Sequence, residues 1–190
     1  MKPRPLRLRH SCTTLLAAAL VATFTRTAVG QPSILQQHTA IFDLDYRPTF
    51  WSGAGAYQRA VQAALPYADI VVGNEDEVRA ATGVEDPRKG IVSLRALGPR
   101  IVVLKRGGEG AALFEDDRVV EVPPVRMEVV NGLGAGDAFL ASVTHGLLRG
   151  INLETAVRRA NWSGAYVASQ VPCSEAMPYL KDVDSAVRVA

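Results

Sequence analysis

The sequence has 190 residues, of which 48% are hydrophobic and 21% are charged, and this is the composition of a folded chain of about one domain. Its 21 basic and 19 acidic residues give a formal net charge of +2, which argues against a nucleic-acid-binding protein. Two cysteines, Cys12 and Cys173, are too few for a disulfide scaffold, and three scattered histidines give little support for a zinc site.

The charges are distributed unevenly along the chain. Residues 1–42 contain five basic residues and no acidic one, whereas the rest of the chain carries 16 basic and 19 acidic residues. This change in composition near residue 40 indicates two segments that have to be interpreted separately. We therefore treat residues 1–39 as an atypical basic and apolar N-terminal segment, and residues 40–190 as the body of the protein.

The N-terminal segment has two interpretations. A basic start, an apolar stretch from Thr13 to Phe24 and small residues at 27–30 together resemble a secretory signal. The alternative is an alanine-rich helix that packs on a sheet, behind a start codon placed by chance. The apolar stretch is shorter than the ~20 residues that a membrane-spanning helix needs, so we expect no stable membrane span. A cytoplasmic location is expected, or a secreted one if residues 1–30 act as a signal.

From residue 40 onward, short β-branched runs alternate with helical patterns. Pro66 ends the first predicted helix, and Gly83 provides a C-terminal cap for the second. Strands separated by helices predict an α/β protein with a mainly parallel, Rossmann-like sheet in three layers. The predicted strands are 40–43, 69–72, 100–105, 111–114 and 119–122, the last two forming a hairpin, and the predicted helices are 55–65, 74–81, 91–97, 135–148 and 153–169.

Polar clusters follow three of the predicted strands, at residues 43–47, 73–77 and 105–108. In sheets of this kind, ligands bind beyond the carboxyl ends of the strands. The pattern therefore predicts a small-molecule site at that edge of the sheet.

The segment Asn131–Phe139 reads NGLGAGDAF and opens the predicted helix 135–148. Small residues at a helix start let backbone N–H groups approach a ligand, and the helix dipole stabilises an anion there. Asp137 falls in the first helical turn, where it is either a partner of the dipole or a base that accepts a proton from a substrate hydroxyl. The segment is not a Walker A loop, because no Lys-Ser/Thr pair follows the last glycine.

The ordered motifs of the chain resemble those of the PfkB/ribokinase family of carbohydrate kinases over roughly residues 40–180. GAGDAF at 134–139 lies downstream of an Asn74-x-x-Glu77 pair and upstream of Asn161 in RANWSGA. Three longer stretches, DLDYRPTFW, VVNGLGAGDAF and CSEAMP, are similar to the 5-dehydro-2-deoxygluconate kinases of inositol catabolism. The resemblance implies a ribokinase-like fold and ATP-dependent, Mg²⁺-dependent transfer of a phosphoryl group to a hydroxyl of a sugar or sugar acid.

The resemblance also implies roles for individual residues. Asp137 corresponds to the catalytic base, and Gly134, Ala135 and Gly136 correspond to the anion hole that meets charge on the transferred phosphoryl group. Glu77 is the residue expected to arrange Mg²⁺, partly through water. The expected nucleotide-side residues are Asn74, Lys105, Gly107, Asn161, Arg47 and Asp45.

Each of these assignments has a structural alternative. Glu77 could be a solvated residue at an acidic helix start, and Asp45 with Arg47 could be an ion pair. Lys105 could belong to a surface strand end, and Asn161 could be an amide on a helix surface. A chain that binds nucleotide or a partner without catalysis is the corresponding functional alternative.

The chain also departs from the family. The first glycine-rich signature, most sugar-binding residues and the β-sheet lid are not recognisable in it, so we expect a kinase domain truncated on its N-terminal side, with little or no activity by itself. An open sheet edge predicts association into homo-oligomers. Leu133 stands where many relatives have a side chain that helps to bind a monovalent cation, so potassium activation is not expected.

Overall fold

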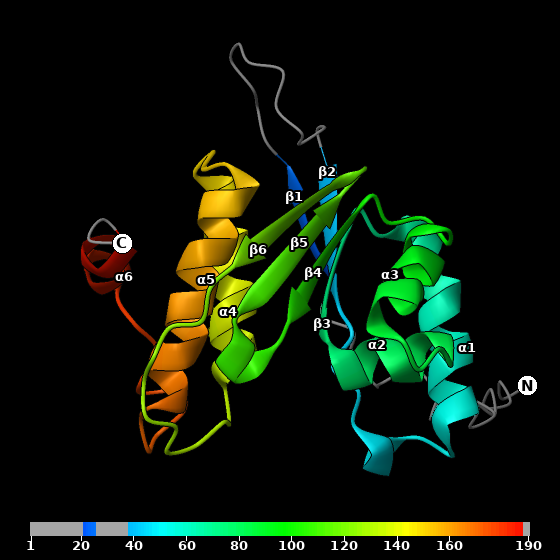
Figure 1. Cartoon of the computed structure of the whole chain (residues 1–190), viewed down its shortest axis with the longest axis horizontal. Helices are drawn as coiled ribbons and strands as arrows, with labels where there is room; N and C mark the ends of the chain where they lie inside the picture. The colour runs from blue at the N-terminus through cyan, green and yellow to red at the C-terminus, as the bar shows by residue number, and fades with distance from the viewer. Residues whose placement is uncertain (1–20, 26–37, 188–190) are drawn as a thin grey trace, which may run out of the picture.

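A six-stranded mixed sheet forms the middle layer of the structure (Figure 1). The computed structural model describes residues 21–25 and 38–187. The strands lie in sequence order, with β2, β3 and β4 parallel to one another and the other pairings antiparallel. Their bounds are β1 Val21–Thr25, β2 His38–Asp43, β3 Ile70–Asn74, β4 Ile101–Lys105, β5 Ala111–Glu115 and β6 Arg118–Val122.

Helices cover the sheet on both faces (Figure 1). The helices α1, α2 and α3 lie on one face, α4 and α5 lie on the other, and α6 packs on the outer side of α5. The bounds are α1 Ala54–Ala64, α2 Glu75–Thr82, α3 Pro87–Arg95, α4 Ala135–Leu148, α5 Leu153–Ala168 and α6 Leu180–Val187, with short 3-10 turns at Pro48–Phe50, Leu65–Tyr67 and Gly107–Glu109.

The two central strands are buried because both of their faces meet helices. Ile70, Val72 and Val103 belong to the core under α4 and α5, whereas Val71 and Val102 belong to the core under α1, α2 and α3. This alternation explains why β3 and β4 are almost continuous runs of β-branched residues. Burial of these runs fixes the register, in which Asn74 at the end of β3 pairs with Lys105 at the end of β4.

The predicted three-layer α/β class is confirmed, and so is the hairpin of β5 and β6. The sheet is mixed rather than mainly parallel, since the parallel part comprises β2, β3 and β4 only. The prediction of a helix at 91–97 was wrong in its bounds: α3 begins at Pro87, with Asp86 as its N-terminal cap. The C-terminal helix α6 was not predicted.

Residues 21–24 form part of a strand that pairs with β2, so the alternative of a helix there is wrong. The remainder of the predicted signal-like segment, residues 1–20 and 26–30, lies outside the described residues, as do residues 31–37. In the part of the chain that is described, none of the helices combines the length and apolar character that crossing a membrane requires.

Candidate functional site

A glycine turn precedes α4 at the carboxyl edge of the sheet. Gly134 has φ +81°, a left-handed conformation that favours glycine, and it caps the N-terminus of α4. The preceding loop is held in place by Asn131, whose Oδ1 accepts a hydrogen bond from the N–H of Leu133 at 3.0 Å and whose Nδ2 donates to the carbonyl of Val171 at 3.1 Å. The turn is therefore shaped by its own sequence and by the segment that follows α5.

The start of α4 is close to two neighbouring elements. A Cβ atom built on Gly164 of α5 would lie 3.1 Å from the carbonyl oxygen of Ala135, which shows how closely the two helices pack. A Cβ atom built on Gly136 would lie 3.6 Å from Nζ of Lys105, at the end of β4. The N–H of Ala135 donates to the carbonyl of Gly132 at 3.3 Å, so the first-turn N–H groups that lack an intrahelical partner are those of Gly136 and Asp137, next to the ammonium group.

Asp137 lies in the first turn of α4 and is exposed to solvent. The residues that follow it, Ala138, Phe139 and Leu140, are buried against the sheet and α5. The helix is thus anchored just beyond Asp137, while the carboxylate itself is accessible. An accessible carboxylate next to free backbone donors can accept a proton from a bound hydroxyl group.

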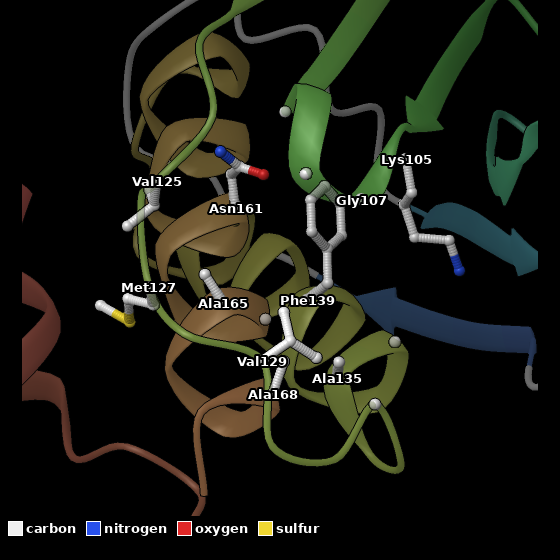
Figure 2. A pocket seen from close by; sticks show the side chains of 15 residues that line it. Lys105, Gly107, Val125, Met127, Val129, Ala135, Phe139, Asn161, Ala165 and Ala168 are labelled. Atoms are coloured by element: carbon white, nitrogen blue, oxygen red, sulfur yellow. The ribbon is translucent and has the colours of Figure 1, made fainter.

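A pocket of about 300 Å³ opens between the glycine turn, α5 and the end of β4 (Figure 2). One wall of the pocket consists of apolar side chains from the segment between β6 and α4. Small residues of α5 form another wall. An apolar slot with few polar groups suits a planar aromatic ligand. Its lining residues include Lys105, Gly107, Ala135, Gly136 and Asn161 from the predicted site, and Gly108, Gly110, Val125, Met127, Val129, Gly132, Phe139, Gly164, Ala165 and Ala168.

Asn161 is a nearly buried polar residue on the pocket wall, with 8% of its surface exposed. Its Nδ2 donates a hydrogen bond to the carbonyl of Pro123 at 2.9 Å, and this bond fixes the orientation of the amide. Figure 2 shows the side-chain oxygen on the opposite side, toward the Gly107 turn. The structural alternative of a surface amide does not hold, because Asn161 faces the pocket.

Lys105 points away from Asn161 in Figure 2 and reaches toward β2. Its Nζ donates to Oδ1 of Asp43 at 3.3 Å and lies 3.6 Å from Oε2 of Glu77. All three side chains are largely buried, with 16%, 11% and 10% exposed for Lys105, Asp43 and Glu77. Burial raises the pKa of Asp43, and the nearby Glu77 adds to the rise, while Lys105 opposes it.

Asn74 and Glu77 form a reciprocal cap at the start of α2. Oδ1 of Asn74 accepts from the N–H of Glu77, and Oε2 of Glu77 accepts from the N–H of Asn74. Glu77 is therefore not the solvated residue that the structural alternative supposed, because only 8% of its surface is exposed. Within residues 21–25 and 38–187, no group of three or more His, Cys, Asp or Glu side chains could hold a metal ion. Any Mg²⁺ ion held at Glu77 would therefore need most of its oxygen ligands from water or from a bound ligand, and Mg²⁺ commonly keeps such ligands.

Asp45 and Arg47 are not brought into the pocket. Nε of Arg47 donates to Oδ1 of Asp45 at 2.8 Å, and both side chains are exposed, at 57% and 43% respectively. Asp45 also has φ +32°, an uncommon conformation for a residue with a side chain. The observed geometry is an ion pair, as the structural alternative for these two residues supposed, and it lies at the surface.

Sequence reasoning missed two parts of the site. Asp43 stood in a predicted polar cluster, but its contact with Lys105 joins residues 62 positions apart and depends on the strand order. The apolar wall of Val125, Met127 and Val129 belongs to a segment without regular secondary structure. No motif marks that segment, and the alternation of apolar and charged residues from Val125 to Val129 is the signal that could have drawn attention to it.

Two relatives of known name are similar to this chain in sequence. The chain is 31% identical over 153 residues to a 5-dehydro-2-deoxygluconokinase of Shouchella clausii, covering 77% of this chain and 46% of that protein. It is 28% identical over 155 residues to the 5-dehydro-2-deoxygluconokinase of Bacillus subtilis, covering 80% and 47%. The chain therefore spans about half the length of these relatives.

Solved structures share the fold and confirm its predicted ribokinase-like character. An aminoimidazole riboside kinase from Salmonella enterica, complexed with aminoimidazole riboside and an ATP analog, superimposes with a TM-score of 0.70 at 25% identity, covering 76% of this chain and 50% of that one. A putative ribokinase II from E. coli, in complex with ATP and Mg²⁺, gives 0.71 at 23% identity, covering 78% and 48%. Residues 22–179 match the family profile described as pfkB family carbohydrate kinase, and the chain belongs to that family.

Proposed function

We propose that the chain forms the nucleotide side of a kinase that transfers the terminal phosphoryl group of ATP to a hydroxyl of a sugar or sugar acid. The observation that carries this proposal is the glycine turn at the start of α4, which lies between an apolar pocket and the ammonium group of Lys105. Free N–H donors, a helix dipole and a lysine at one point favour the phosphate end of a ligand.

The pocket suits the remainder of a nucleotide. Val125, Met127 and Val129 offer one apolar face to a base, and Ala165 and Ala168 offer the other. Asn161 and the Gly107 turn supply polar groups at the rim. In this arrangement Ala135, Gly136 and Gly134 are the anion hole, and Asn74 and Lys105 lie on the phosphate side.

Mg²⁺ fits the same edge of the sheet. The buried carboxylate of Glu77 is a hard oxygen donor that is held in place by its hydrogen bond with the N–H of Asn74. The metal would neutralise charge on the phosphates, and Glu77 would hold it through one oxygen or through water. Asp45 and Arg47 would have to turn toward the phosphates from the surface position that they occupy.

The sugar hydroxyl would meet Asp137. We infer that this carboxylate accepts the hydroxyl proton as the oxygen attacks the phosphoryl group, while the amides of the turn stabilise the charge that develops. The substrate class that the relatives favour is 5-dehydro-2-deoxygluconate, since proteins named for that reaction align with 77–80% of the chain.

Binding of Mg·ATP to the whole chain, measured by calorimetry, tests the proposal. In Gly136→Ala the new methyl group points at the ligand side of the turn and meets Nζ of Lys105 at an ordinary 3.6 Å. The variant should therefore fold normally and bind Mg·ATP at least ~10-fold more weakly. Gly55→Ala on α1 is the matched control, and equal affinities for both variants would contradict the assignment.

A second candidate function is nucleotide binding without transfer. The solvent exposure of Asp137 favours it, because a base that transfers a proton efficiently needs water to be excluded around it. An ADP-release assay with 5-dehydro-2-deoxygluconate separates the two functions. Turnover that depends on the sugar supports the kinase, whereas Mg·ATP binding without such turnover supports the second candidate.

A further inference from the structure

Three charged side chains from different strand ends converge beside the glycine turn. Asp43 ends β2, Glu77 lies one turn into α2 after β3, and Lys105 ends β4. Because β2, β3 and β4 are parallel, their carboxyl ends meet at one edge, and the register pairs Lys105 with Asn74 directly. The contact is a consequence of the sheet and not of local sequence.

The charges of this trio do not balance. One ammonium lies 3.3 Å from Asp43 and 3.6 Å from Glu77, so a single positive charge serves two acidic side chains that are 11% and 10% exposed. Glu77 also accepts a hydrogen bond from the N–H of Asn74, but that bond brings no net charge. Buried carboxylates without full compensation are costly, which favours any further cation at this place.

The ammonium also faces the proposed phosphate position. Nζ lies 3.6 Å from where a Cβ atom of Gly136 would be, on the first turn of α4. Lysine carries its charge on a flexible four-carbon stem, so a small rotation moves Nζ between the carboxylates and the turn. The ammonium group of Lys105 is thus within reach of both the two carboxylates and the proposed phosphate position.

We propose that Lys105 is a positioning residue that couples the two sites: an anion at the glycine turn draws its ammonium away from Asp43 and Glu77, and the freed carboxylates then bind a divalent cation more tightly. The inference rests on the proposed function. It adds that phosphate and metal strengthen each other's binding. Linkage makes the coupling reciprocal, so Mg²⁺ must strengthen anion binding by the same factor. Without the anion, Lys105 competes with the metal.

Mg²⁺ titration of the nucleotide-free chain tests the competition directly. Lys105→Met removes the ammonium, so we expect its Mg²⁺ affinity, measured by calorimetry and by the rise in melting temperature, to exceed that of the wild type by ~10-fold. Lys89→Met, an exposed position on α3, is the matched control and should bind Mg²⁺ like the wild type. Equal or weaker Mg²⁺ binding by Lys105→Met, or no Mg²⁺ effect on either protein, overturns the proposal.

A measurement on the wild type guards against a variant that does not fold. With inorganic phosphate as the probe, and with concentrations expressed as free Mg²⁺, phosphate should raise the Mg²⁺ affinity of the wild type several-fold, while an unchanged affinity overturns the coupling. Mg·ATP binding by the wild type is recorded in parallel. If Mg·ATP binds but the coupling is absent, only this inference fails, whereas absence of Mg·ATP binding removes the proposed function as well.

Discussion

Glu77 accepts a hydrogen bond from the backbone N–H of Asn74 at 2.7 Å, while Oδ1 of Asn74 accepts one from the N–H of Glu77 at 2.9 Å. The two residues that the family resemblance assigns to Mg²⁺ and phosphate are therefore also the two halves of a capping box that starts α2. A helix cap holds both side chains in fixed orientations at the carboxyl end of β3. Fold stability and the proposed ligand site consequently depend on the same pair.

Comparing Asn74→Ala with the loss of another helix cap separates the structural role of Asn74 from its proposed role in ligand binding. We expect Asn74→Ala to lower the free energy of unfolding by ~1 kcal/mol, because the cap is lost, and also to weaken Mg·ATP binding. Asp86 caps α3 by accepting from the N–H of Lys89 at 3.0 Å and is not one of the predicted site residues. Asp86→Ala should show a similar stability loss in urea unfolding with unchanged Mg·ATP affinity. Equal nucleotide affinities for the two variants would assign a purely structural role to Asn74.

Asp137→Asn preserves the shape of the side chain and removes the base. In any preparation that shows sugar-dependent ADP release, we expect the turnover to fall at least ~100-fold while Mg·ATP affinity stays within a few-fold of the wild type. Glu75→Gln in the first turn of α2 is the control, since Glu75 is likewise exposed near a helix start. Retention of full turnover in Asp137→Asn would show that another group accepts the proton.

Asn161→Ala tests the pocket wall. The substitution removes the hydrogen bond to Pro123 and leaves that carbonyl without this partner, so the free energy of unfolding should fall by ~1 kcal/mol. Nucleotide affinity should fall as well, and this can be followed with a fluorescent ATP analogue. Asn152→Ala removes the cap of α5, where Asn152 accepts from Thr155 at 2.9 Å, and should cost stability without changing affinity. If Asn152→Ala weakens binding as much as Asn161→Ala, the effect comes from α5 and not from the pocket wall.

The pH dependence of stability should carry a contribution from Asp43. Burial raises its pKa above the ordinary value of 3.8, so between that value and its raised pKa the folded state binds more protons than the unfolded state. Stability from this group therefore falls as pH rises through that window. In Mg²⁺-free buffer, the free energy of unfolding of the wild type relative to Asp43→Asn should decrease from pH 4 upward. A relative stability that increases over the same range would mean that the pairing with Lys105 outweighs burial.

Self-association is expected at the β6 edge. Among the described strands β6 is bonded only to β5, and Val119 on it is 47% exposed. Unpaired strand edges with exposed apolar residues favour pairing with another chain. Sedimentation should show association that grows with concentration and is weakened by Val119→Lys, whereas Val92→Lys on the exposed face of α3 should leave it unchanged. A concentration-independent monomer would contradict this expectation.

Local chemistry explains which elements could be predicted from the sequence. The runs IVV in β3 and β4 are buried on both faces, and Asn74 and Gly83 carry strong cap signals for α2, so these elements followed from pattern alone. The start of α3 was missed even though Asp86 and Pro87 form a typical helix start, because the apolar residues begin only at Ile91. Val21–Thr25 was missed because strand pairing with β2, and not its own alanine-rich surroundings, determines its conformation.

The site was predictable only where motifs mark it. Gly134, Ala135, Gly136 and Asp137 are contiguous, so their place at the start of α4 followed from the sequence. The contact of Lys105 with Asp43 could not be predicted, because it depends on the order of three strands. Arg47 was expected near the phosphates, but its nearest carboxylate, Asp45, lies two residues away and forms an ion pair with it at the surface.

The central claim is that the turn at Gly134–Asp137 binds the phosphate end of a nucleotide. Titration of the isotopically labelled chain with Mg·ATP, followed through backbone amide chemical shifts, tests it most directly. We expect saturable shifts at the amides of Ala135, Gly136 and Gly107, with little change along α3. A well-dispersed spectrum in which those amides do not move at millimolar Mg·ATP would contradict it.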